Sequence, residues 1–297
     1  MPDTDTQPTT GTTGAAATAD GGVGPLEVPV QRSFWDRNRA RVIVAAGRLL
    51  LLAVALAAWE AASGPVLDPL FVSRPSDILA RLLDWAGDGT LWFNTRITLT
   101  EIVLGYLLGS AAGVVAGFAI APQRTLGKVL DPYVMALYSI PKVALAPLFI
   151  IWFGIGVSMK VLLAAVTVFF LVFLNTVAGV RDVDTGLVEA VRLMGGRRRD
   201  VLLKVILPAS MGGVVTGLRV AIPYALLGAV IGELVASNRG LGYLISDSAA
   251  KYDTAGVFAA IVVLSIIAAL ANVAVDVLEG RSSRWKPQAE PGARRGT

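Results

Sequence analysis

Several charged and polar side chains lie inside segments of the chain that are otherwise apolar. A charge at the centre of a membrane helix costs about 2.5–3.5 kcal/mol on insertion scales, so such residues are candidates for handling an ion or a solute. Polar groups of this kind are expected to face the interior of a helix bundle rather than lipid. Their chemistry is reversible binding along a translocation pathway, and the candidates are Tyr138, Ser139, Lys142, Asn175, Arg219 and Glu233.

Covalent chemistry is not expected of this chain. It contains no cysteine and no histidine, which excludes thiol nucleophiles, histidine bases and a Cys/His zinc site. A phosphate-binding loop is also absent: Gly127-Lys128 comes nearest, but Pro122 and Val129 occupy the positions of the required glycine and hydroxyl residue. We therefore expect no catalytic residue, no metal and no cofactor on the chain, and any ATP hydrolysis must take place on a partner.

Two interpretations of Lys142 stay open. Pro141 and Pro147 should kink the apolar segment that contains it and free backbone carbonyls, which is tolerated where a helix lines a cavity. The ammonium would then face a pathway. Alternatively, Lys142 lies near a membrane surface and its long side chain extends to water. Asn175 is favoured as a pathway residue because no simple bond to its own helix is expected for it.

The composition is typical of a membrane protein, since 55% of the residues are hydrophobic and only 16% are charged, against about 25% in soluble domains. A membrane-spanning helix needs about 20 apolar residues. We expect an all-α membrane protein with six transmembrane helices. They are placed near 42–62, 97–121, 130–153, 160–180, 212–236 and 255–278.

The two ends of the chain differ in composition from this transmembrane region, 36–280. Residues 1–35 are rich in Thr, Gly, Ala, Pro and Asp without apolar periodicity, which predicts a disordered N-terminal tail. Residues 281–297 read as a polar C-terminal tail. The net charge of +4 is too small to suggest binding to nucleic acid.

Lysine and arginine are distributed unequally between the two sides of the predicted membrane region. With six spans and the N-terminus inside, most of these residues fall in the parts placed in the cytosol, which sets the orientation. The outer parts contain few, and Lys160 is counted among them. Both termini and residues 187–208 are therefore expected on the cytosolic side.

Residues 187–208 form the longest mixed polar and apolar stretch between two spans. Helical spacing of apolar residues predicts a short helix, and Gly195-Gly196 should end it because glycine adopts left-handed dihedrals without strain. Asp200 favours the start of a second short helix, which Pro208 is expected to end. Two short helices joined by a glycine hinge predict a docking site for a soluble partner, although an amphipathic helix lying on lipid is an alternative.

Two further patterns concern packing and the outer surface. Gly105, Gly109, Gly113 and Gly117 repeat at every fourth position, and similar pairs occur in the fifth span, which allows another helix to approach closely. The partner helix belongs either to the same chain or to a second subunit. Outside the membrane, the segment 240–245 is expected to form a short helix whose apolar face dips back into the bundle.

These motifs resemble those of a known family. Glu189-Ala190, Gly195 and Ile206-Leu207-Pro208 together resemble the EAA signature of the membrane subunits of bacterial ABC importers, with Val191 in place of the second alanine. Over about residues 65–278 the chain is similar to one branch, the permeases for nitrate, sulfonates, taurine and related small anions or vitamin precursors. The stretches that carry this second resemblance are SRPSDIL at 73–79, DPYVMALYSIPKVALAPLFIIWFGIG at 131–156, GLGYLI at 240–245 and VFAAI at 257–261.

The resemblance implies a type I ABC importer permease fold in the bacterial inner membrane, crossed several times. It further implies a second copy of the permease, a dimer of ATPase subunits that binds ATP, and an extracytoplasmic solute-binding protein. The residues that would couple the chain to the ATPase are Glu189, Ala190, Gly195, Leu207 and Pro208.

A different function is an ion-coupled secondary transporter or channel, which would use Glu101, Lys142, Arg219 and Glu233 as ion-coupled groups. Such transporters commonly contain inverted repeats, and none is visible in this sequence. A membrane enzyme is disfavoured by the lack of histidine, cysteine and paired carboxylates.

Overall fold

The computed structural model describes residues 34–64, 68 and 70–282, and every regular element within them is a helix. Apart from four positions in the first and last helices, the two predicted tails, 1–35 and 281–297, lie outside the described residues. The chain divides into two compact units, with the boundary after Val54.

The first unit contributes most of one helix, α1 (Phe34–Ala62). Between residues 42 and 54 its large apolar side chains are exposed along the whole surface of the helix. The apolar stretch Val42–Ala62 is long enough to cross a membrane. A helix that is apolar all round suits lipid as its surroundings, which agrees with the first predicted span.

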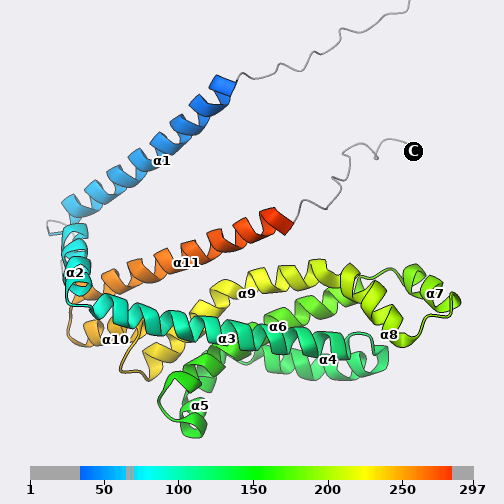
Figure 1. The fold of residues 1–297 in the computed structure, drawn as a ribbon. Helices are drawn as coiled ribbons and strands as arrows, with labels where there is room; N and C mark the ends of the chain where they lie inside the picture. Colours follow the sequence, from blue (N-terminus) through cyan, green and yellow to red (C-terminus); the bar gives the residue numbers. More distant parts are fainter. Residues whose placement is uncertain (1–33, 65–67, 69, 283–297) are drawn as a thin grey trace, which may run out of the picture. The chain divides into compact units, whose positions relative to one another are not determined.

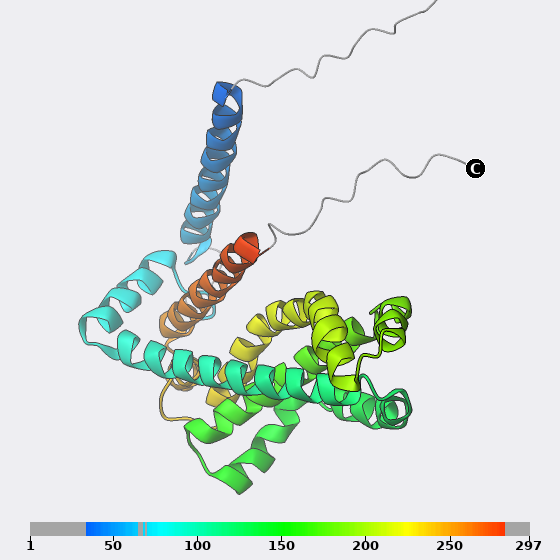
Figure 2. The ribbon, with the colours of Figure 1, turned by 45° about the vertical axis from the view of Figure 1, so that its right-hand side comes forward.

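Three long helices form the centre of the second unit: α3 (Thr90–Ile120), α6 (Val157–Arg181) and α9 (Leu207–Val235). The α6 helix packs along both of the others, and the three lie side by side in both views (Figure 1, Figure 2). The short helices α7 and α8 lie at one end of this group, whereas α2 and α10 lie at the other.

The glycine ladder of α3 faces α6 of the same chain. A Cβ atom added at Gly109 would lie 2.3 Å from the carbonyl oxygen of Ala165, so only glycine allows this approach. In α9, a Cβ added at Gly213 would lie 2.7 Å from the Cα of Gly179 in α6. Both glycine faces are therefore occupied by contacts within one chain, which settles the alternative left open by the sequence.

At the α2–α10 end, three helices and the C-terminal part of α9 bury a common apolar core. The three helices are α2 (Pro75–Gly87), α10 (Leu241–Ala250) and α11 (Thr254–Ser282). The buried residues are Ile78, Trp85, Val230, Leu241, Leu244, Ala259, Ala260 and Leu264. The expected helix of residues 240–245 is present as the start of α10.

The stretch predicted as a single third span is broken in the structure. It consists of α4 (Arg124–Ser139), the 3₁₀ turn η1 (Lys142–Leu145) and α5 (Ala146–Phe153), with a bend of 83°. The break falls at Pro141, which lacks the N–H that would continue the helix. Pro147 was expected to add a second kink, but it lies in the first turn of α5, where a missing N–H costs nothing.

Five of the described helices are long and apolar enough to cross a membrane, and the bent pair formed by α4 and α5 makes a sixth candidate. Besides α1, these are Thr90–Ile120, Val157–Arg181, Arg198–Val235 and Thr254–Ala274. The total agrees with the six spans expected from the sequence.

Candidate functional site

The polar stretch between the fourth and fifth spans folds as a helical knuckle, which we define as residues 185–201. Its first helix, α7 (Thr185–Leu193), is capped by Asp184, whose side chain accepts a hydrogen bond of 2.7 Å from the Gly186 N–H. Gly195 ends the helix with a φ of 82°, the left-handed conformation expected for glycine there. The Gly196 N–H then donates to the Val191 carbonyl at 2.9 Å, which fixes the turn.

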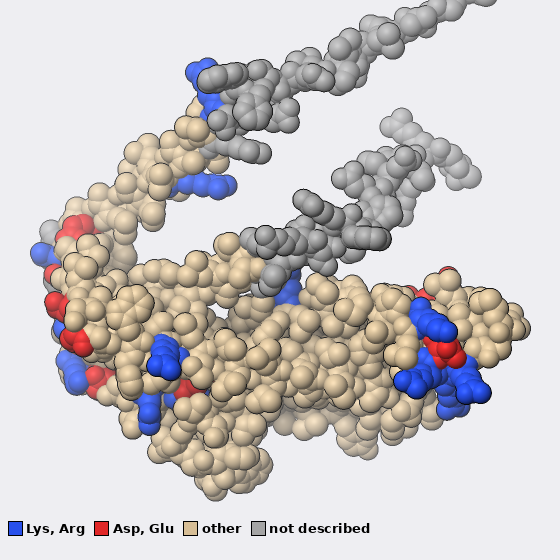
Figure 3. All heavy atoms as spheres, in the orientation of Figure 1, with Lys and Arg blue, Asp and Glu red and all other residues tan. Residues whose placement is uncertain are grey.

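The surface of the knuckle is unusually apolar for an exposed helix end. Leu193 and Met194 are 89% and 78% exposed, and no residue of α7 is buried. Glu189 is exposed on the same helix, and its carboxylate makes no hydrogen bond or ion pair with the described residues. Basic side chains gather beside this end of the molecule in Figure 3, and the sequence places Arg197, Arg198 and Arg199 there. Such a surface suits a soluble protein partner better than an internal contact.

The second half of the segment corrects one expectation about Pro208. Instead of ending a short helix, α8 (Arg198–Val201) continues through a π turn, η2 (Leu202–Ile206), directly into α9. In this turn the Leu207 N–H donates to the Leu202 carbonyl, five residues earlier. The wider turn leaves room for the proline ring, which would otherwise clash with the carbonyl four residues before it. Leu207 and Pro208 therefore lie in the first turn of α9.

Three of the predicted pathway residues come together at the broken span. Tyr138, Ser139 and Lys142 line a cavity of about 380 Å³ between the break, α6 and α9. The Lys142 ammonium donates to the carbonyl of Tyr138 and lies 4.5 Å from the centre of the Tyr138 ring. Lys142 thus bonds to the last turn of α4, four residues earlier in its own segment.

Asn175 and Arg219 do not line this cavity. The Asn175 amide donates to the Leu171 carbonyl at 2.8 Å, so it does bond to its own helix, contrary to expectation. Its Cβ lies against Gly217 at the contact between α6 and α9. Arg219 is half-buried in α9. A pathway role for these two residues stays a prediction.

Glu233 belongs to a buried polar cluster at the opposite end of the core helices. Its carboxylate is 1% exposed and accepts hydrogen bonds from the Thr98 hydroxyl at 2.7 Å and the Gly242 N–H at 2.7 Å. Close by, the Lys160 ammonium lies 2.5 Å from the Glu101 carboxylate, and both side chains are at most 2% exposed. Glu101 and Glu233 are thus held by partners within the chain, which is not the arrangement expected for ion-coupled groups along one path.

Sequence reasoning missed Lys160 as a core residue, because it was counted among the lysines and arginines of the outer parts of the chain. In the structure it lies in the first turn of α6 and is buried between α3 and α9. The signal that could have found it is Glu101, an acidic residue inside another apolar segment. A buried charge requires a partner of opposite charge, and few cations are available at this end.

Side chains of α3 and α9 in and beside this cluster also cap the start of α10. The first N–H groups of α10 have no partners within the helix. The Gly240 N–H donates to Asn94 at 2.7 Å, the Leu241 N–H to Thr98 at 2.8 Å, and the Gly242 N–H to Glu233. Two core helices, α3 and α9, therefore hold the start of α10 in place.

The chain matches a family of membrane transport proteins. Residues 105–284 match the family described as binding-protein-dependent transport system inner membrane component. The matched region contains the knuckle, the broken span and most of the core helices. The chain is a member of this family.

Similar proteins agree with this assignment. The permease is 32% identical to the taurine transport system permease protein TauC of Escherichia coli, over 86% of this chain and 94% of TauC. It is 33% identical to the riboflavin transport system permease protein RibX of Chloroflexus aurantiacus, over 89% of this chain and 96% of RibX.

Solved structures show the same fold. The permease matches a chain of the inward-facing MetNI methionine ABC transporter with a TM-score of 0.55 at 22% identity, covering 67% of this chain and 97% of that one. The type I importer permease fold expected from the sequence is thus confirmed. The protein is a multi-pass inner membrane subunit of an ABC importer that needs an ATPase and a binding protein as partners, and it carries no ATPase site or cofactor of its own.

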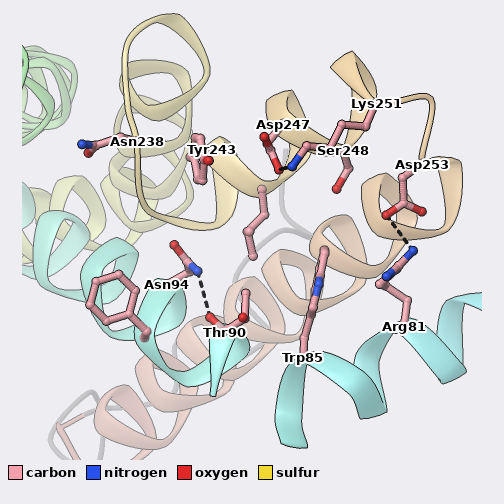
Figure 4. A pocket seen from close by; sticks show the side chains of 12 residues that line it. Arg81, Trp85, Thr90, Asn94, Asn238, Tyr243, Asp247, Ser248, Lys251 and Asp253 are labelled. Atoms are coloured by element: carbon pink, nitrogen blue, oxygen red, sulfur yellow. Dashed lines mark hydrogen bonds and ion pairs between the residues drawn. The ribbon is translucent and has the colours of Figure 1, made fainter. Parts of the chain in front are cut away.

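The permease has a second pocket, of about 560 Å³, at the α2–α10 end (Figure 4). Two ion pairs lie along it: Arg81 with Asp253 at 3.1 Å, and Lys251 with Asp247 at 2.6 Å. The hydrogen bond with Asp247 raises the pKa of the Lys251 ammonium. Asn94 points into the same pocket from α3. Asn94, which accepts the hydrogen bond from the Gly240 N–H at the start of α10, therefore also lines this pocket.

Proposed function

We propose that two copies of this permease form the translocation pathway for a small solute, with nitrate, sulfonates, taurine or a related small molecule as the substrate class. Its relatives are named for taurine, riboflavin and formylaminopyrimidine, so the family alone leaves the substrate open. The observation that carries the proposal is the knuckle, an exposed surface that no part of the described chain covers.

The coupling role is assigned to Glu189, Ala190, Gly195, Leu207 and Pro208. The left-handed Gly195 lies in the turn between α7 and α8, and the continuous helix from α8 into α9 joins the knuckle to a core helix. A movement imposed on the knuckle is therefore transmitted to α9 through one helix with a π turn. The ATPase subunits bind and hydrolyse ATP, and their movement is transmitted to the knuckle.

We also propose that both termini and the knuckle lie in the cytosol, because most Lys and Arg residues lie on that side of the six spans. The α2–α10 end then faces outward. The pocket in Figure 4 is lined by residues of this end, where the solute-binding protein would dock. The transmembrane region 36–280 is the permease domain in this arrangement.

The Glu189→Lys variant tests the coupling role. Glu189 is exposed and its carboxylate makes no hydrogen bond or ion pair with the described residues, so its replacement should leave the fold and membrane insertion intact. Reversal of the charge should weaken ATPase binding by at least about tenfold, because an interfacial charge is left unpaired or repelled. The measurement is the amount of ATPase that co-purifies with the tagged permease.

A matched control is Asp84→Lys, which reverses an exposed charge on α2 at the opposite end. This variant should retain the ATPase. If Glu189→Lys co-purifies with as much ATPase as the control, the knuckle is not the coupling surface.

A further inference from the structure

The cavity beside the broken span lies among helices that are candidates to cross the membrane. It lies along the C-terminal half of α9, from Tyr224 to Ile231, and along α6 from Leu163 to Leu171. Irregular backbone at such a depth is tolerated only where it is buried in protein or lines a water-filled space. The break at Ile140–Pro141 lines the cavity, so it meets that condition here.

The Lys142 ammonium has only neutral contacts in the described part of the chain. It donates to the Tyr138 carbonyl and lies 4.5 Å and 5.3 Å from the centres of the Tyr138 and Phe170 rings. No carboxylate among the described residues pairs with it. The other lysine in the core, Lys160, shows the contrast, since Glu101 neutralises it at 2.5 Å. A positive charge among carbonyls and aromatic rings attracts an anion.

Two phenol groups add hydrogen-bond donors to the same cavity. Neither the Tyr138 nor the Tyr224 hydroxyl has a hydrogen-bond partner among the described residues, and both side chains line the cavity. The hydroxyls of Ser139 and Thr167 instead donate to carbonyls of their own helices, at 2.8 Å each. Two free donors and one ammonium together suit the several oxygens of one small anionic group.

The remaining wall of the cavity is apolar. Its other side chains include Ile140, Val143, Leu171, Leu227 and Ile231. Binding sites for small molecules commonly combine an apolar wall of this kind with a few placed polar groups, in volumes of about 300–1,000 Å³. The cavity is at the lower end of that range, so it fits a small oxyanion that carries a short apolar body.

We propose that this cavity is an intramembrane binding site for the transported solute, and that the solute is a small organic anion whose head group pairs with the Lys142 ammonium. Tyr138 and Tyr224 donate to the oxygens of the head group, and the apolar wall holds its body. The inference rests on the proposed function and narrows the substrate to anions. In this proposal, the Lys142 ammonium has a counter-ion only while a solute is bound.

The test uses the full-length permease in lipid nanodiscs, without the ATPase or the binding protein. The probe is ethanesulfonate, and its neutral isostere ethyl methyl sulfone is the comparison. The rise of Tm with probe concentration gives Kd, because a ligand that binds only the folded state stabilises it. Ethanesulfonate should raise the Tm, and the sulfone should not.

Four variants locate the site. Lys142→Met should weaken ethanesulfonate binding by about tenfold or more, since a charge-assisted contact is lost. Lys142→Arg should restore most of the binding because it keeps the charge. Lys128→Met, which removes an exposed lysine of α4 far from the cavity lining, should bind as the wild type does. If Lys142→Met fails to fold, Tyr224→Phe provides a milder test and should weaken binding severalfold.

Three results would overturn the proposal. They are no stabilisation of the wild type by ethanesulfonate, equal stabilisation by the sulfone, or unchanged Kd in Lys142→Met. Glu189→Lys should bind ethanesulfonate like the wild type, because the knuckle is not part of the cavity. A negative result for ethanesulfonate binding would therefore overturn the proposed site without affecting the coupling role, which is tested separately by ATPase co-purification.

Discussion

At the scale of single residues, the two core lysines show how the same charge serves two different purposes. Lys160 is buried between helices and pairs with Glu101, so this ion pair joins α6 to α3. Lys142 lies beside a cavity with only neutral groups around it. The sequence shows both as lysines near apolar segments, and only their partners distinguish them.

Thr98 is the residue on which the cap of α10 depends most. It is fully buried, donates to Glu233 and accepts from the Leu241 N–H. We expect Thr98→Val to lower the free energy of unfolding by about 1–3 kcal/mol, because two buried groups lose their partner without any change of shape. The measurement is the unfolding midpoint of the purified permease in detergent.

Thr176→Val is the matched control for this change. Thr176 is equally buried, but its hydroxyl donates only to the Val172 carbonyl of its own helix. The loss of such a bond should cost little, since that carbonyl keeps its helical partner. Equal destabilisation by the two variants would show that Thr98 does not hold α10.

At the scale of the elements, close helix contacts organise the core, and glycine makes them possible. In α9 the neighbouring residues Gly212 and Gly213 differ only in what they face. A Cβ at Gly212 would meet nothing within 4 Å, whereas one at Gly213 would lie 2.7 Å from the Cα of Gly179. This pair separates the effect of packing from that of helix propensity.

We expect Gly213→Ala to force α6 and α9 apart and to destabilise the permease by about 1–3 kcal/mol. Gly212→Ala should instead leave stability unchanged or raise it by about 0.5–1 kcal/mol, because alanine favours the helix. Thermal unfolding of both variants in the same detergent is the measurement. A destabilised Gly212→Ala together with a stable Gly213→Ala would contradict the packing described.

Much of this element structure could be predicted from the sequence, because apolar length, glycine spacing and proline position act locally. The number of spans, the glycine hinge at Gly195 and the break at Pro141 follow from such patterns. The π turn before Pro208 could not be predicted, since it depends on how α8 joins α9. The cluster around Glu101, Lys160 and Glu233 joins three distant segments, so only their packing reveals it.

At the scale of the whole molecule, the permease joins two ends with different tasks. One end exposes the knuckle, with the apolar side chains of Leu193 and Met194, and the other holds α10 beside the pocket shown in Figure 4. Core helix α9 connects them, since its first turn follows the knuckle and Glu233 near its last turn caps α10. If the proposed coupling role holds, a movement of the knuckle would reach the pocket in Figure 4 along one helix.

The central claim is that a soluble ATPase docks on the knuckle, and photo-crosslinking in intact membranes tests it most directly. The chain has no cysteine, so Met194→Cys provides a single site for a benzophenone maleimide on a side chain that is 78% exposed. Phe93→Cys, exposed at the opposite end, is the control. The account predicts a covalent adduct with the ATPase subunit from position 194 and none from position 93. Adducts from position 194 with lipid alone would contradict it.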